Sequence, residues 1–84
     1  MYHLTWFSDP GHAWLQVGWD LINDLRWTNV SKYSYYDDEF VYLEEDSDAP
    51  KFLEFLNSRN LGFELVNELW YEEDSFVRDL ARWV

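Results

Sequence analysis

The sequence predicts a single small α+β domain, with a mainly antiparallel sheet of about five strands and two to three short helices packed on one face. Three observations support this fold class. The chain has 84 residues, which is enough for one domain and not for two. Runs rich in aromatic and β-branched residues alternate with stretches whose apolar residues recur at helical spacing. No linker, internal repeat or low-complexity segment divides residues 1–84, so they are expected to form one unit.

The elements are expected in the order ββαββαβα, because the hydrophobic period changes repeatedly between that of a strand and that of a helix. Strands are expected at residues 2–8, 13–17, 33–36, 40–43 and 63–71. Helices are expected at residues 19–27, between a cap at Ser47 or Asp48 and an end at Asn60 or Gly62, and after Ser75. The first two strands form a hairpin, since Asp9-Pro10-Gly11-His12 has the proline and glycine of a tight turn.

The last predicted strand and helix each have a clear apolar side. In the strand, Phe63, Leu65 and Leu69 alternate with Glu64 and Glu68, so one face is expected to enter the core and the other to be partly solvated. The final helix is expected to bury a stripe formed by Phe76, Val77, Leu80 and Ala81.

The charge balance indicates the class of partner. Seventeen acidic residues face six basic ones, which gives a formal net charge of −11. Such a surface repels nucleic acid and anionic membranes, so neither is an expected partner. The expected partner is a basic protein surface, such as that of a nuclease or another nucleic-acid-binding protein. Acidity that serves only solubility is the alternative.

Aromatic residues are unusually frequent. Six Trp, six Tyr and six Phe make up 21% of the chain. One small core is not expected to hide all eighteen, and exposed Trp and Tyr are typical of interfaces. The surplus is consistent with a heterologous partner or with a homodimer.

The sequence argues against most chemistry. There is no cysteine, which excludes disulfides and thiolate ligands. His3 and His12 show no ligand spacing, and the acidic run from Glu44 to Asp48 lacks the glycine and distal glutamate of a calcium loop. We therefore expect no enzyme activity, catalytic residue, cofactor or metal site.

The candidate site is a set of acidic residues with one aromatic, expected to contact the partner. These residues are Asp37, Asp38, Glu39, Glu44, Glu45, Asp46, Asp48, Glu64, Glu68, Glu72, Glu73 and Trp70. Glu64 and Glu68 are expected to form a column along one strand face, because alternate strand residues point to the same side.

Five segments together resemble a group of small proteins of phages and mobile elements. They are Asp9-Pro10-Gly11-His12-Ala13-Trp14-Leu15-Gln16-Val17, Tyr33-Ser34-Tyr35, Tyr42-Leu43-Glu44-Glu45-Asp46, Asp48-Ala49 followed by Phe52, and Asp74-Ser75-Phe76-Val77-Arg78. The chain departs from the group's pattern at Ala13, where glycine is usual, and at Ser47, where cysteine is expected. The resemblance spans nearly the whole chain and implies a viral or plasmid setting, but it assigns no activity and no functional residue.

These observations lead to one functional hypothesis and two alternatives. The hypothesis is a non-enzymatic inhibitor of a host nucleic-acid-handling defence protein, of the anti-CRISPR or anti-restriction type, that occludes a basic groove with its acidic surface. The first alternative is a homo-oligomeric structural or accessory protein, and the second is a small carboxylate-dependent hydrolase or metal-binding protein. The start of the chain has neither a signal peptide nor a long apolar stretch, so a cytoplasmic location in the host cell is expected.

Overall fold

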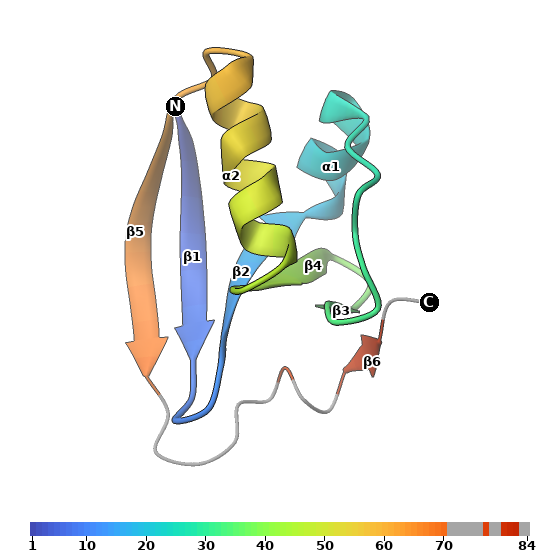
Figure 1. Ribbon diagram of the computed structural model, residues 1–84, viewed down its shortest axis with the longest axis vertical. Coiled ribbons are helices and arrows are strands. Elements are labelled where there is room, and N and C mark those ends of the chain that lie inside the picture. Colours follow the sequence, from blue (N-terminus) through green and yellow to red (C-terminus); the bar gives the residue numbers. More distant parts are fainter. Residues whose placement is uncertain (71–76, 78–79, 83–84) are drawn as a thin grey trace.

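A computed structural model describes residues 1–70, 77 and 80–82 of the chain. In this part the protein is a small α+β domain with a mixed sheet and two helices (Figure 1). The strands are β1 Tyr2–Ser8, β2 Ala13–Gly18, β3 Tyr35–Tyr36, β4 Phe40–Glu44, β5 Phe63–Trp70 and β6 Ala81–Arg82, and the helices are α1 Trp19–Leu25 and α2 Asp48–Ser58. None of the helices in these residues is long and apolar enough to span a membrane.

The sheet has the strand order β5-β1-β2-β4-β3-β6. The predicted β1–β2 hairpin is present, with Ser8 opposite Ala13 on either side of the 9–12 turn. β4 pairs antiparallel with β2, and β3 and β6 continue the sheet antiparallel beyond it. β5 lies at the other edge and runs parallel to β1 (Figure 1). The pairing is therefore mainly antiparallel, with one parallel pair that makes the sheet mixed.

Both helices pack on the same face of the sheet. Inward-pointing residues of β1, β2 and β4 form a core cluster with Ile22 of α1 and with Ala49, Phe52 and Leu56 of α2. The ring of Trp27, which follows α1, packs edge-on against Phe52 with 5.1 Å between ring centroids. The two short helices together cover this face of the sheet. The aliphatic side chains of β1, β2 and β4 that point toward the helices are therefore buried.

A second hydrophobic cluster lies on the opposite face of the sheet. Phe7, Trp14, Tyr35 and Tyr42 are buried there, together with Val77 from the C-terminal part of the chain. The ring of Trp14 packs edge-on against Tyr35, and the ring of Phe7 against Tyr42. Among the described residues, most aromatic side chains thus belong to one of the two clusters, and Tyr33 is the one Trp, Tyr or Phe in this part of the chain that is clearly exposed.

The C-terminal prediction is corrected in part. Ala81 was expected in the buried stripe of a final helix, but it begins strand β6, which pairs with β3. Val77 is buried as predicted, although against the face opposite the two helices. The rest of the predicted final helix, from Ser75 onward, falls mainly outside the described residues.

Candidate functional site

In the described part of the chain, most exposed acidic residues have no lysine or arginine partner. Seven carboxylates are exposed in the described residues: Asp20, Asp24, Asp38, Glu39, Asp46, Glu54 and Glu64. Glu64 pairs with His3, at 3.6 Å between Oε2 and Nδ1, and none of the other six forms an ion pair with a lysine or arginine in the same part of the chain. Lys32 and Arg59 instead lie over the rings of Tyr33 and Phe55.

The turn between β3 and β4, residues Asp37–Glu39, forms what we call the acidic tip. One oxygen of Asp37 accepts hydrogen bonds from the backbone N–H groups of Glu39 and Phe40, at 2.9 and 2.8 Å. Asp37 is therefore used to shape the turn, and Asp38 and Glu39 project into solvent. The backbone N–H of Trp19 donates to the carbonyl oxygen of Glu39, so the start of α1 lies beside the tip.

The predicted binding residues do not form one patch. The acidic tip precedes β4 and the acidic run 44–48 follows it, so the length of this strand, about 14 Å, separates them. Glu64 is on the edge strand β5, on the far side of β1 and β2. The structure therefore places exposed acids at both ends of the sheet and along one edge.

Asp48 is a structural residue. It is fully buried at the start of α2. Its Oδ2 accepts hydrogen bonds from the backbone N–H and the hydroxyl of Ser31 and from the hydroxyl of Ser34. The predicted role of Asp48 in contacting a partner does not fit this position, because its carboxylate holds the loop before β3 against the first turn of α2.

Four predicted residues have no described side chain. Glu68 and Trp70 belong to β5, where their backbones pair with Trp6 and Ser8 of β1. Glu72 and Glu73 lie outside the described residues. The expected column of Glu64 and Glu68 is therefore described only at Glu64.

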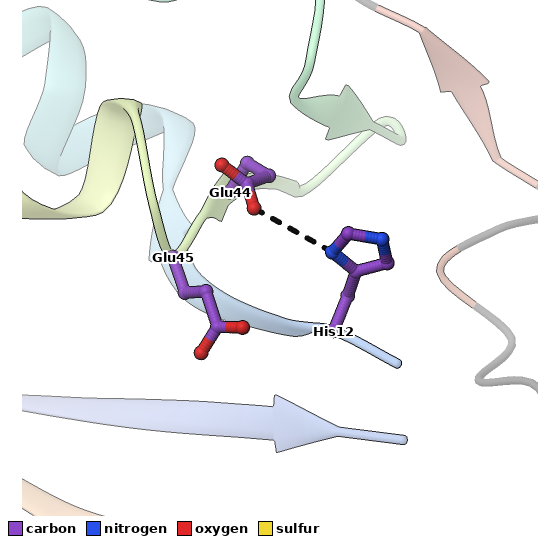
Figure 2. Close-up of side chains that lie close together, drawn as sticks. All are labelled: His12, Glu44 and Glu45. Carbon is purple, nitrogen blue, oxygen red and sulfur yellow. Dashed lines mark ion pairs between the residues drawn. The ribbon is translucent and has the colours of Figure 1, made fainter. Parts of the chain in front are cut away.

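The structure brings Glu44 and Glu45 together with a residue that was not predicted, His12 (Figure 2). Each of the three offers one ligand atom, and these atoms all lie within 4.8 Å of one another. The antiparallel pairing of β2 with β4 explains the convergence, because it sets Trp14 opposite Glu44 and thus the 9–12 turn beside the end of β4.

Local hydrogen bonds fix the positions of these residues. Oδ1 of Asp9 accepts from the backbone N–H groups of Gly11 and His12, both at 2.9 Å, which closes the turn that carries the imidazole. The Oε2 atom of Glu44 accepts from the backbone N–H of Asp46 and the hydroxyl of Ser47, also at 2.9 Å. Its other oxygen, Oε1, faces Nδ1 of His12 at 3.7 Å.

The surroundings of Glu45 shift the pKa of its carboxyl. Partial burial raises the pKa of its carboxyl above the usual range, and the neighbouring charges of Asp46 and Glu44 raise this pKa further. His12 acts in the opposite direction and lowers it. The sequence thus places three consecutive carboxylates where their charges repel, beside one imidazole.

A cleft of about 470 Å³ opens next to this group. It is lined by Trp14, Tyr33 and Tyr35 on its aromatic side and by His12, Glu44, Asp46 and Ser47 on its polar side. Aromatic walls beside carboxylates suit a cationic or planar group, because such a group can contact a ring face and an anion at once.

Sequence reasoning missed His12 because it searched for ligand spacing along the chain. His12 is 32 positions before Glu44, and only strand pairing makes them neighbours.

Comparison with known proteins adds no family to this description. No family model matches the chain, and no curated protein or solved structure shows significant similarity to it. The viral or plasmid setting therefore stays a prediction from the resemblance of the five segments.

Proposed function

We propose that this protein is a non-enzymatic binding protein that docks its exposed acidic groups onto the basic surface of another protein. The observation that carries the proposal is the absence of lysine or arginine partners for six exposed carboxylates in the described part of the chain. A surface carboxylate without a basic neighbour contributes its whole negative charge to the electrostatic potential around the protein. This potential attracts a basic partner and repels acidic ones.

The contact surface we propose consists of the acidic tip and Asp46, with Tyr33 as an apolar anchor. Asp38, Glu39 and Asp46 are exposed, and 54% of the surface of Tyr33 is accessible. Arginine and lysine side chains of the partner would pair with these carboxylates, and the tyrosine ring would cover the apolar part of the contact. Glu44 and Asp48 take no part, because both are buried and hydrogen-bonded within the fold.

We propose further that the partner is a host protein that handles nucleic acid and that the chain occludes its basic groove. Such a groove carries the positive charge that contacts phosphates, so a rigid acidic domain competes for the same residues. Inhibition of a defence nuclease, of the anti-CRISPR or anti-restriction type, is the biological role that fits a phage or mobile-element setting.

Capture followed by competition tests this function. The immobilised chain is incubated with nuclease-treated bacterial lysate, and each captured protein is purified and bound to labelled duplex DNA or RNA. We expect the free chain to displace the nucleic acid in a saturable manner. A captured protein that binds nucleic acid and the chain at the same time would contradict occlusion.

A matched variant assigns the displacement to the acidic tip. Asp38→Lys with Glu39→Lys reverses two exposed charges at the tip, and Asp24→Lys with Glu54→Lys reverses two exposed charges on the helices. Both doubles change the net charge equally. The tip double is expected to lose displacement and the helix double to retain it.

A further inference from the structure

We propose that His12, Glu44 and Glu45 form a binding site for a divalent transition-metal ion of the zinc class. This inference goes beyond the proposed docking function and uses other residues. It also departs from the expectation, drawn from sequence spacing, that the chain has no metal site.

The separation of the ligand atoms supports a shared ion. Nδ1 of His12 and Oε1 of Glu44 are 3.7 Å apart, which is too long for a hydrogen bond. Two ligands of one tetrahedral zinc ion, with bonds of about 2.0–2.2 Å, are separated by about 3.3–3.6 Å. The third ligand atom, from Glu45, lies within 4.8 Å of both, and rotation of this partly exposed side chain closes the remaining gap.

The two oxygens of Glu44 have different surroundings, and only one of them is held by hydrogen bonds within the fold. Only 9% of this residue is exposed. Its Oε2 is hydrogen-bonded twice, whereas its Oε1 accepts no hydrogen bond from the described residues and is aimed at the gap that faces His12 (Figure 2). Two hydrogen bonds thus fix the orientation of this carboxylate, and its second oxygen is left in position to act as a ligand beside the imidazole.

The donor set selects the class of metal. One imidazole nitrogen with two carboxylate oxygens suits zinc and neighbouring first-row dications, whereas magnesium and calcium prefer ligands that are all oxygen. The hydrogen bonds from Asp46 and Ser47 to Glu44 are the outer-shell contacts that orient a metal-ligating carboxylate. His12 and Glu44 also line the cleft, so a fourth coordination position would be open to water or to a small ligand there.

The chain provides its own matched control. His3 and Glu64 form a second histidine–glutamate pair, at 3.6 Å, with 61% and 56% of their side chains exposed. This pair has a separation similar to that of His12 and Glu44, but it belongs to no group of three ligands in the described residues. If zinc bound nonspecifically to surface histidines, removal of His3 and removal of His12 would weaken zinc binding equally.

Calorimetric titration with Zn²⁺ tests the site, using the full chain after EDTA treatment and its His12→Ala, Glu45→Gln and His3→Ala variants. His12 is exposed and Glu45 is partly exposed, so these substitutions leave the core intact. We expect one ion per chain, an affinity at least about tenfold weaker in His12→Ala and Glu45→Gln, and an unchanged affinity in His3→Ala. Mg²⁺ is expected to give no saturable heat.

A spectroscopic readout separates the site from a simple ion pair. Co²⁺ bound in place of Zn²⁺ is expected to give the visible absorption of a four-coordinate site. This absorption should disappear in the His12→Ala variant. The proposal is overturned if the wild-type chain binds no zinc saturably, or if His3→Ala and His12→Ala weaken binding equally. Because neither Asp38 nor Glu39 belongs to the site, the tip double is expected to bind zinc normally, so metal binding and docking can fail separately.

Discussion

Hydrogen bonding divides the acidic residues around β4 into two groups with different roles. Asp37, Glu44 and Asp48 accept hydrogen bonds from backbone or hydroxyl donors of the fold. Asp37 and Glu44 do so within their own turns, whereas Asp48 connects α2 to the loop before β3. Asp38, Glu39 and Asp46 lie next to them in sequence but project into solvent. Charge density along the chain therefore does not identify the residues that can contact a partner.

Asp48 gives the clearest prediction at this scale. Asp48→Ala removes three hydrogen bonds to a buried carboxylate and leaves the hydroxyls of Ser31 and Ser34 without an acceptor. We expect the free energy of unfolding to fall by about 3 kcal/mol, since hydrogen bonds to charged groups contribute more than neutral ones. Urea denaturation measures this change. Asp46→Ala is the control, and a similar loss in both variants would contradict a special role for Asp48.

The elements show which sequence signals determine local structure. Strands β1, β2, β4 and β5 lie within one residue of their expected positions, because alternation and turn residues define them strongly. The first helix was expected to reach residue 27 but ends at Leu25, where Arg26 adopts a left-handed conformation with φ of 54°. Trp27 enters the core instead of continuing the helix, so tertiary packing overrides the apolar spacing.

The end of α1 allows a test by glycine substitution. Arg26→Gly relieves the steric cost of a left-handed residue, and this gain exceeds the opposing cost, which is the additional conformational entropy that a glycine loses on folding. We expect the free energy of unfolding to rise by about 0.5 kcal/mol. Lys51→Gly, at an exposed position within α2, makes the same change of charge and is expected to lower it by about 1 kcal/mol. Thermal and urea unfolding of both variants would contradict this account if Arg26→Gly were the more destabilised.

For the molecule as a whole, the sequence predicts the layers of the fold better than the site. The spacing of apolar residues is a local property of the chain, and it was sufficient to predict the α+β class, the β1–β2 hairpin and helices on one face of the sheet. Two long-range pairings did not follow: β5 beside β1, and β6 beside β3. The pairing of β2 with β4 determines which motif residues meet, and the group of His12, Glu44 and Glu45 depends on it.

The second cluster also changes the interpretation of composition. Eighteen aromatic residues suggested an exposed apolar surface, yet the sheet buries Trp14, Tyr35 and Tyr42 on the face opposite the helices. A sheet covered on both sides can hide more aromatic area than a single core. In the part of the chain that the structure describes, the exposed surface is therefore less aromatic than the composition alone implied.

The most direct measurement of charge-driven docking is the association rate of the chain with its captured partner as a function of salt. Between about 0.01 M and about 0.1 M ionic strength the screening length falls from about 30 Å to about 10 Å, so a steered association slows steeply. For the wild-type chain and the Asp24→Lys, Glu54→Lys double we predict a steep decrease in the association rate. For the Asp38→Lys, Glu39→Lys double we predict a slow rate with little dependence on salt. Equal rates and equal salt dependence for the two doubles would contradict docking through the acidic tip.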